Sequence, residues 1–389
     1  MTAKKGENMQ KAVLAPDSFK GVLSAKEVCD IMAYRINKYY PFCEIVKVPV
    51  ADGGAGSIDA FLCCKEGKKI FVNALNADMQ MTKCYFMVYE NTAVIETSQL
   101  MSVYCGTRGK YGASSYGVGQ LVMQALRFNV SRIILCLGQN VLADCGCGMA
   151  AALGAKFFDA SYKEFVPDFL RLGNVVTIDL SQMRKNLSMT NVVALTGENY
   201  PVSGENGLVA RLLDKNVLQS EDVQAAENSL NAFCDFLKRN FGRDYREYAG
   251  TGASFGLGLG AMTFFDATIS RGIDTVLDIV NFGGLIKDAD VIFTGEGSLD
   301  VNSVYGNVLN AVCRYARRQN VPVVDIVGKI GNVDRARLAA DGVAAIFALN
   351  NDIFVKNPHE STSLALAAFM DELIGFWQIK HARANGGLF

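Results

Sequence analysis

Three short acidic stretches of the 389-residue chain contain residue types suited to phosphate or metal chemistry. They are residues 15–21 (APDSFKG), 51–54 (ADGG) and 294–300 (TGEGSLD). Each places a carboxylate close to a glycine, whose lack of a side chain lets a ligand approach the backbone. Carboxylate oxygens are the ligands that Mg²⁺ prefers, and Lys20 adds a positive charge suited to a phosphate or carboxylate group.

The secondary structure expected around these three stretches places each of them directly after a strand. Strands are predicted at residues 12–15, 45–50 and 290–294, so each acidic stretch follows the carboxyl end of a strand. In an open parallel sheet, ligands bind outside the carboxyl ends of the strands. Ser24, with Glu27 three residues later, predicts a capped helix start after the first stretch, and a helix N-terminus favours an anion.

The acidic stretches and one glycine-rich run each allow two interpretations. Each acidic stretch is either part of a ligand site or an ordinary connecting loop, in which Asp17 or Asp300 only caps a helix. Residues 250–260 (GTGASFGLGLG) match no dinucleotide fingerprint, because no good strand precedes them. Their glycines either cradle a phosphate or allow close helix packing. No Walker A pattern is present in the chain.

Both ends of the chain alternate strands with helices, and the middle does not. Residues 69–73 and 83–96 are instead expected to be extended segments in a partly antiparallel arrangement. Repeated strand–helix units predict a doubly wound parallel sheet. We therefore expect an α/β protein in which residues 1–67 and 286–389 form one domain. A second domain, residues 68–285, is inserted into it.

Periodicity and turn signals predict further elements in both regions. Helices are expected at residues 115–128, 148–153, 221–241, 303–318 and 361–380, and strands at 132–137, 321–327 and 344–349. Ser220 is the expected N-cap of the third helix. Glycines predict loops at 295–297 and 328–331, and residues 160–190 are weakly patterned.

Composition excludes several classes of protein. With 38 Lys and Arg against 39 Asp and Glu, the chain has no electrostatic footprint for nucleic acid or an anionic membrane. No apolar run of signal-peptide or spanning length follows the polar first residues, so we expect a cytoplasmic protein. The 11 cysteines are scattered, as reduced thiols are, and no Cys/His set has zinc-ligand spacing. With two histidines, both near the C-terminus, a His-based catalytic triad is not expected. The oligomeric state, including a homo-oligomer, stays open.

Taken together, these stretches resemble the bacterial glycerate kinases of the glycerate 2-kinase type. The motifs occur in family order along nearly the whole chain: 15–25 (APDSFKGVLSA), 47–54 (KVPVADGG), 115–119 (SYGVG), 146–149 (GCGM), 250–253 (GTGA), 271–274 (RGID), 288–290 (DAD) and 295–300 (GEGSLD). The resemblance implies ATP-dependent phosphorylation of D-glycerate or a related small hydroxy acid, with Mg²⁺. It also implies a Rossmann- or flavodoxin-like domain paired with a second, inserted α/β domain, with the active-site cleft between them.

The resemblance and the acidic stretches together give a set of candidate site residues. Glu198 stands where the family has the second Asp of DVDN and is the first candidate for the catalytic base, with Asp52 and Lys20 as further catalytic candidates. Candidates for substrate or phosphate binding are Asp17, Ser18, Ser24, Gly53, Gly54, Asp144, Gly252, Glu296, Gly297 and Asp300. Candidates for holding Mg²⁺ are Asp52, Glu296 and Asp300.

The chain departs from the family pattern at polar positions. Ser298 stands where GEGRLD has arginine, and Asn307 where a later Gly-Lys has lysine. Phe255 replaces a glycine and is expected to crowd a phosphate, whereas Asp144 is kept. Phosphoryl transfer depends on positive charge, and losing one such contact typically costs about 10²–10³ in rate. Two functions therefore stay open: an active kinase, or a catalytically impaired relative that binds a metabolite or nucleotide in a regulatory or partner role.

Overall fold

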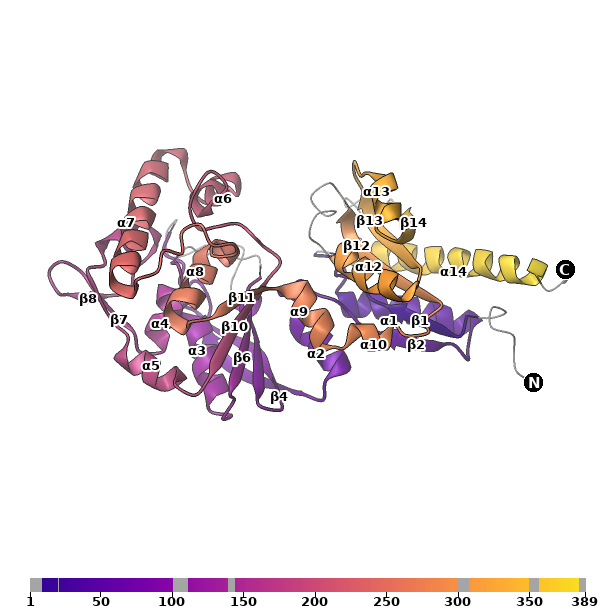
Figure 1. The fold of residues 1–389 in the computed structure, drawn as a ribbon, viewed down its shortest axis with the longest axis horizontal. Coiled ribbons are helices and arrows are strands. Elements are labelled where there is room, and N and C mark those ends of the chain that lie inside the picture. The colour runs from indigo at the N-terminus through magenta and orange to yellow at the C-terminus, as the bar shows by residue number, and fades with distance from the viewer. Residues whose placement is uncertain are drawn as a thin grey trace. The chain divides into compact units, whose positions relative to one another are not determined.

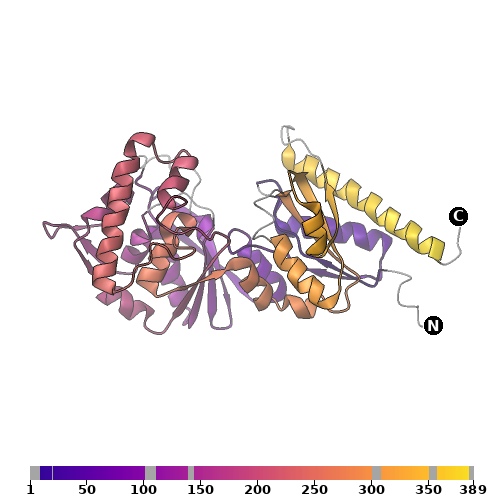
Figure 2. The same ribbon diagram turned by 45° about the horizontal axis from the view of Figure 1, so that its top comes forward.

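The structure, a computed structural model, describes residues 9–19, 21–100, 111–138, 144–299, 308–349 and 357–384. The chain divides into two units, which Figures 1 and 2 show as ribbons. Unit 1 comprises Met1–Asp52, Asp59–Cys64 and Ile273–Phe389, and unit 2 comprises Gly53–Ile58 and Lys65–Gly272. The sequence pattern places the corresponding boundaries at 67/68 and 285/286. Within the described residues, no helix combines the length and apolar character needed to cross a membrane.

Unit 1 is built on a five-stranded sheet in which all strands run parallel. Its elements are β1 (Lys11–Leu14), α1 (Ala25–Tyr39), β2 (Glu44–Lys47), α2 (Ser57–Cys64, which begins in unit 2), α9 (Gly272–Ile279), α10 (Phe282–Leu285), β12 (Val291–Leu299), α12 (Val308–Gln319), β13 (Val323–Ile330), α13 (Arg335–Ala340), β14 (Val343–Ala348) and α14 (Pro358–Ala384). The sheet order is β14-β13-β12-β1-β2. Counted along the chain within this unit, the order is that of flavodoxin-like doubly wound sheets. The predicted doubly wound parallel sheet is therefore confirmed.

Helices cover both faces of the unit 1 sheet, because successive side chains of a strand point to opposite faces. Val13 and Ile292 pack on one face with α12 residues such as Val312. Leu14 and Phe293 pack on the other face with α1 and α14. These strand side chains are fully buried, and burying one such apolar side chain stabilises a fold by about 1.5–3 kcal/mol.

One carboxylate interrupts the apolar core of unit 1. Asp325 lies in β13 between Val323 and Val327, which share its face of the strand and belong to the α12-side core. Its side chain is 1% exposed, and neither carboxylate oxygen has a hydrogen-bond partner among the described residues. Because burial penalises the charged form, the pKa of Asp325 is raised to about 7.

Two strands of unit 1 are longer than predicted. Glycines at 295–297 and 328–331 predict loops, but β12 continues to Leu299 and β13 to Ile330. The two strands stay paired to these ends, with Leu299 opposite Ile330. A Cβ on Gly295 would lie 2.4 Å from the carbonyl oxygen of Ile326, and one on Gly328 would lie 2.5 Å from that of Gly297. The loop prediction was wrong because these glycines serve close strand approach.

Unit 2 contains a mixed six-stranded sheet of order β11-β10-β6-β5-β4-β3 and a three-stranded sheet of order β8-β7-β9. Its strands are β3 (Lys68–Leu75), β4 (Met81–Tyr89), β5 (Thr92–Glu96), β6 (Arg132–Cys136), β7 (Lys156–Phe158), β8 (Glu164–Phe165), β9 (Thr177–Asp179), β10 (Asn191–Thr196) and β11 (Thr268–Arg271). Strands β3 to β5 pair antiparallel, and β5, β6, β10 and β11 pair parallel. The partly antiparallel arrangement predicted here is confirmed.

The helices predicted in unit 2 at residues 115–128, 148–153 and 221–241 are confirmed, whereas the other three named here were not predicted. The helices are α3 (Tyr116–Leu126), α4 (Cys147–Ala152), α5 (Ser181–Leu187), α6 (Leu208–Asp214), α7 (Val223–Phe241) and α8 (Ala253–Phe265), with short 3₁₀ turns at Thr97–Gln99, Phe169–Asn174 and Ser220–Asp222. Ser220 was predicted to cap α7, but it lies inside a 3₁₀ turn and the N-cap is Asp222. The prediction was wrong because the extra turn precedes the first α-helical residue.

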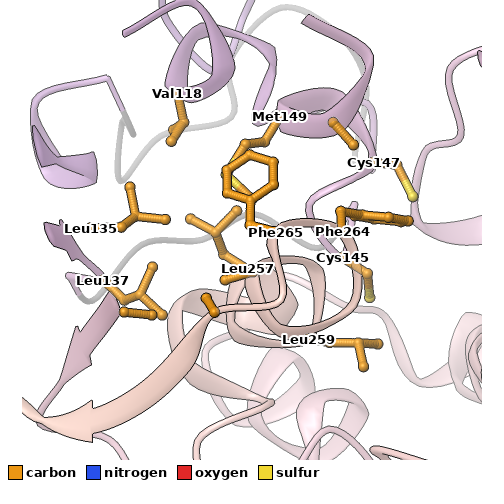
Figure 3. Packing of buried hydrophobic residues seen from close by; sticks show 14 of the residues in the cluster. Val118, Leu135, Leu137, Cys145, Cys147, Met149, Leu257, Leu259, Phe264 and Phe265 are labelled. Atoms are coloured by element: carbon orange, nitrogen blue, oxygen red, sulfur yellow. The ribbon is translucent and has the colours of Figure 1, made fainter. Parts of the chain in front are cut away.

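The glycine-rich run forms much of α8 and packs into the core of unit 2 (Figure 3). A Cβ on Gly256 would lie 2.9 Å from Cys145 Sγ, and one on Gly260 would lie 2.5 Å from the Cys145 carbonyl oxygen. A Cβ on Gly258 would lie 2.1 Å from the carbonyl oxygen of Gly250. Of the two interpretations left open, close helix packing therefore accounts for Gly256, Gly258 and Gly260.

Candidate functional site

Three of the predicted site carboxylates lie at the carboxyl edge of the unit 1 sheet: Asp17, Asp52 and Glu296. The stretches that contain them are joined by backbone hydrogen bonds. The N–H of Asp17 donates to the carbonyl oxygen of Gly295 (2.8 Å), and the N–H of Val50 donates to that of Pro16 (2.9 Å). The chain changes direction across the sheet between β1 and β12, which is where an open parallel sheet binds its ligand.

The predicted magnesium ligands are described only in part. Lys20 and Asp300 lie outside the described residues. The oxygens of Asp52 and Glu296 match the donors that Mg²⁺ prefers. In the described part of the chain, however, no three His, Cys, Asp or Glu side chains form a group that could hold a metal ion. The site formed by Asp52, Glu296 and Asp300 therefore stays a prediction.

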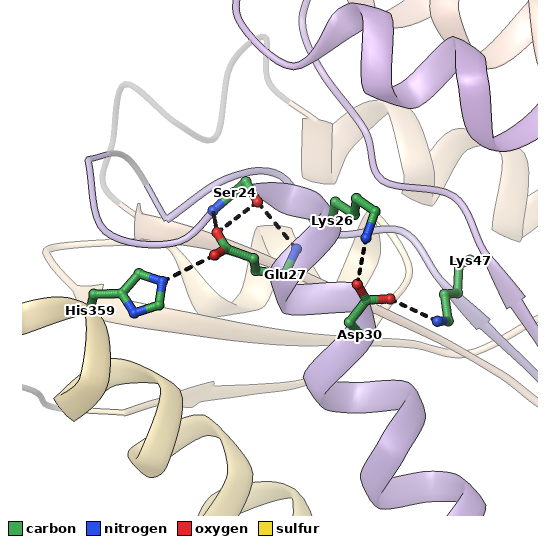
Figure 4. Close-up of polar contacts among 6 residues, drawn as sticks. All are labelled: Ser24, Lys26, Glu27, Asp30, Lys47 and His359. Carbon is green, nitrogen blue, oxygen red and sulfur yellow. Dashed lines mark hydrogen bonds and ion pairs between the residues drawn. The ribbon is translucent and has the colours of Figure 1, made fainter. Parts of the chain in front are cut away.

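Ser24, a predicted anion ligand, is the N-cap of α1 (Figure 4). Its hydroxyl oxygen accepts the backbone N–H of Glu27 (3.2 Å), and the Glu27 carboxylate accepts the backbone N–H of Ser24 (2.8 Å). The hydrogen bonds from Ser24 lower the pKa of Glu27 to about 2, with a smaller contribution from His359. At Ser18, the backbone N–H donates to Asp17 Oδ1 (2.6 Å).

We expect Ser24→Ala to lower the free energy of unfolding by about 1 kcal/mol, because it removes the cap of α1. Urea denaturation at pH 7 measures this, and Ser24→Asp is the matched control because aspartate also caps helices. For ATP and D-glycerate, the substrates that the resemblance implies, we expect KM values within twofold of wild type. A tenfold rise in one KM with unchanged stability would instead assign Ser24 to ligand binding.

Gly53 and Gly54 lie against the strand ends of unit 2. The φ angle of Gly53 is +90°, and a Cβ there would lie 2.9 Å from the Leu195 side chain at the end of β10. The carbonyl oxygen of Gly54 accepts the hydroxyl of the first residue of α2 (2.7 Å). The N–H of Ile58 donates to the carboxylate of Glu96 at the end of β5 (2.6 Å). These contacts hold Gly53 at the end of β10 and the start of α2 at the end of β5, both within unit 2.

Glu198 follows β10 at this same edge of unit 2. Its carboxylate oxygen Oε2 accepts the backbone N–H of Ser254, at the start of α8 (2.9 Å). Its own backbone N–H donates to the hydroxyl of Thr196 (2.9 Å). The side chain is half-buried. A carboxylate oriented in this way by rigid backbone suits a general base, which must lie within hydrogen-bond reach of the proton it removes.

The turn that holds Glu198 has a strained backbone. Ser254 and Phe255 have φ angles of +51° and +52°, although neither is glycine. A left-handed conformation costs a non-glycine residue about 1–2 kcal/mol, and such strain is frequent at functional sites. Phe255 was expected to crowd a phosphate, but its side chain is 5% exposed and belongs to the apolar core of unit 2.

The Asp144 carboxylate is a buried acceptor of hydrogen bonds from other residues of the chain. Its side chain is 2% exposed, and it accepts the N–H and hydroxyl of Ser115 (2.7 and 2.9 Å) and the N–H groups of Gly146 and Gly148 (3.0 and 3.2 Å). Burial raises the pKa of this carboxyl, and these hydrogen bonds oppose the rise. Asp144 therefore links the starts of α3 and α4.

The two remaining predicted glycines also have internal contacts. The N–H of Gly252 donates to the carbonyl oxygen of Tyr200 (3.1 Å), so that donor is engaged within unit 2. Gly297 lies within β12, where it pairs closely with β13. Sequence reasoning missed Tyr200 and also Glu96 and Thr196, which end β5 and β10. For Glu96 and Thr196, the sequence did offer a signal, because each is a polar residue at the end of a buried apolar strand.

These observations define a class of protein. It is an α/β protein with a flavodoxin-like unit and a mixed-sheet unit, each with polar, glycine-containing strand ends of the kind that binds small anionic molecules. The model of the glycerate kinase family matches residues 12–377. The chain therefore belongs to the glycerate kinase family.

Individual relatives agree with this assignment. The chain is 33% identical to a glycerate kinase from Haemophilus influenzae, over 82% of this chain and 85% of the relative. It is 30% identical to the glycerate 2-kinase of Escherichia coli, over 88% and 91%. The crystal structure of a protein assigned as glycerate kinase 2 from Salmonella typhimurium LT2 superposes with a TM-score of 0.82 at 27% identity, covering 96% of this chain and 99% of that chain. The predicted family and the two-domain α/β fold are confirmed.

Proposed function

We propose that this chain transfers the terminal phosphoryl group of ATP to a hydroxyl of D-glycerate or a closely related small hydroxy acid. The match to the glycerate kinase family over residues 12–377 is the observation that supports this most strongly. In the reaction the substrate hydroxyl oxygen forms a bond to the terminal phosphorus. The bond from that phosphorus to the bridging oxygen of ADP breaks, and the hydroxyl proton passes to a base.

Glu198 is the proposed base. Its carboxylate is held by the Ser254 N–H at the carboxyl ends of the parallel strands β6, β10 and β11 of the mixed sheet, and ligands bind at such strand ends. A positioned carboxylate that accepts the hydroxyl proton contributes about 10²–10⁴ to the rate. The fixed orientation of the Glu198 carboxylate at a strand end supports this proposed role.

Bound magnesium would neutralise charge on the phosphates of ATP. Asp52 and Glu296, at the carboxyl edge of the unit 1 sheet, are the described residues proposed to hold it, together with Asp300. Asp17 and Ser18 at the same edge are proposed to bind substrate or phosphate.

An activity assay tests this proposal. Purified protein is incubated with ATP, Mg²⁺ and D-glycerate, ADP release is followed, and the phosphorylated product is identified by ³¹P NMR. Omission of the hydroxy acid is the control, and tartronate tests the substrate range. We expect a kcat of roughly 1–100 s⁻¹, as for other kinases. Absence of turnover with every hydroxy acid would contradict the proposal.

A second candidate function is a catalytically impaired family member that binds a metabolite or nucleotide. The observation that favours it is Ser298, which is exposed on β12 and uncharged where the resemblance leads us to expect arginine. In that case ATP would raise the melting temperature of the protein in the absence of turnover. The same preparations therefore distinguish the two functions.

A further inference from the structure

Arg211 presents a positive charge next to the Glu198 site. It lies in α6, is exposed, and its guanidinium carbon is 5.1 Å from the centre of the Tyr200 ring. Within the described ranges, no acidic side chain forms an ion pair with this guanidinium. Stacking on an aromatic ring restricts the motion of an arginine without neutralising its charge. In the described part of the chain, Arg211 is therefore held against an aromatic ring with no direct ion pair.

The Tyr200 ring connects this cation to the glycine-rich turn. A Cβ on Gly252 would lie 2.3 and 2.4 Å from two ring carbons, so the ring packs directly on the Gly252 backbone. The Gly252 N–H donates to the Tyr200 carbonyl oxygen (3.1 Å), and the Val202 N–H donates to the Thr251 hydroxyl (3.0 Å). The loop after β10 and the start of α8 are thus fastened together around the ring.

The Tyr200 hydroxyl is buried. The residue is 9% exposed, and its hydroxyl oxygen is buried without a hydrogen-bond partner among the described residues. Burial raises the pKa of Tyr200 and the Glu198 charge raises it further, whereas the Phe255 N–H and Arg211 lower it. The guanidinium carbon of Arg211 lies 5.1 Å from the centre of this ring, and Gly252, which precedes the strained turn, packs on it.

One backbone N–H of this turn already donates to a carboxylate. Ser254, Phe255 and Gly256 have left-handed backbone conformations, and the N–H of Ser254 donates to the Glu198 carboxylate (2.9 Å). The N–H of Gly256 donates to the Gly252 carbonyl oxygen (2.9 Å), so the Ser254 N–H is the donor of this turn that is directed at a carboxylate. The Glu198 carboxylate and the Arg211 guanidinium both act on the Tyr200 side chain, which lies against the start of this turn.

We propose that Arg211, held on the Tyr200 ring beside this turn, binds the phosphate that is transferred at the Glu198 site. This inference rests on the proposed kinase function. An arginine offers a planar set of N–H donors that matches phosphate oxygens, and fixing it in advance reduces the loss of side-chain freedom on binding. It supplies positive charge in a chain that has serine at position 298. Tyr200 acts as a positioning residue, because it orients Arg211 through its ring.

The test compares Arg211→Gln with Arg239→Gln, which removes an exposed arginine of α7. The kcat and the KM for ATP are measured, and ADP and ATP affinity is measured by calorimetry. We expect Arg211→Gln to lower kcat/KM for ATP by about 10²-fold, as loss of one charge-stabilising contact does, and Arg239→Gln to stay within twofold of wild type. Tyr200→Phe keeps the ring and should match wild type, whereas Tyr200→Leu should reproduce much of the Arg211→Gln defect.

Three results would overturn the inference, and they are distinguishable from one another. If wild type turns over and Arg211→Gln has the same kinetics and ATP affinity, Arg211 has no phosphate role, while the proposed function stands. If wild type binds ATP without turnover, equal ATP affinity of wild type and Arg211→Gln overturns the inference, and a tenfold weaker affinity of the variant supports it. If wild type neither binds ATP nor turns over, the proposed function fails and the inference fails with it.

Discussion

Glu198→Gln is expected to lower kcat for phosphorylation by about 10²–10⁴-fold, the usual contribution of a positioned general base. The amide is close in size and keeps an oxygen that can accept the Ser254 N–H, so the turn at the start of α8 stays in place. What is lost is the ability to take the hydroxyl proton. The KM for ATP should change little, because base catalysis acts on the chemical step.

The measurement is steady-state ADP release by wild type and the variant, with urea denaturation to confirm equal stability. Glu205→Gln is the matched control, since Glu205 is an exposed residue of the same connection between β10 and α6. An unchanged kcat in Glu198→Gln would show that another group accepts the proton. A large rise in the KM for the hydroxy acid with unchanged kcat would assign Glu198 to substrate binding instead.

Asp325→Asn is expected to stabilise the protein by roughly 4 kcal/mol at pH 8 and by roughly 2 kcal/mol at pH 5. The ordinary pKa of this carboxyl is 3.8, and burial in unit 1 raises it to about 7. Between these two values the folded state binds more protons than the unfolded state, so stability falls as pH rises from about 4 to about 7. The difference between the two pKa values corresponds to roughly 4 kcal/mol.

The ionisable neighbour of Asp325 does not obscure this effect. Cys313 of α12 is buried, and burial together with the Asp325 charge raises the pKa of its thiol to about 12, so it stays neutral over the range measured. Urea denaturation at pH 5 and pH 8 gives the comparison, and Asp288→Asn, an exposed change in the same unit, is the control. Equal stability of wild type and Asp325→Asn at pH 8 would show that the carboxyl ionises in the fold without penalty.

Much of the fold follows from local patterns that need no tertiary contact. Ser24 and Glu27 predict the start of α1, because the capping box involves only residues three apart. The apolar strands β1, β6 and β12 are predicted because buried parallel strands are short apolar runs. Family motifs identify the glycerate kinase family, since the same residue types recur in the same order.

At glycine positions, the local sequence pattern did not distinguish a loop from a close backbone approach. Gly295 and Gly328 suggest loops by type, yet they lie within β12 and β13 because neighbouring backbones approach too closely for a Cβ. Gly256 and Gly260 suggest a phosphate cradle, yet they pack against Cys145. A glycine permits both a turn and a close approach, and which of the two it serves depends on residues distant in sequence.

The sequence by itself determined the family, the parallel strand–helix pattern and the acidic residues Asp17, Asp52 and Glu198 as candidates, because residue type and order are properties of the chain. Only the tertiary structure decided which side chains form hydrogen bonds or packing contacts and which are buried. It placed Asp144 in an internal hydrogen-bond network, Asp325 in an apolar core, and the Tyr200 ring between Gly252 and Arg211. Which side chains are buried, and which hydrogen-bond or packing partners they have, depends on segments far apart along the chain. Such contacts leave no periodicity or motif in the sequence.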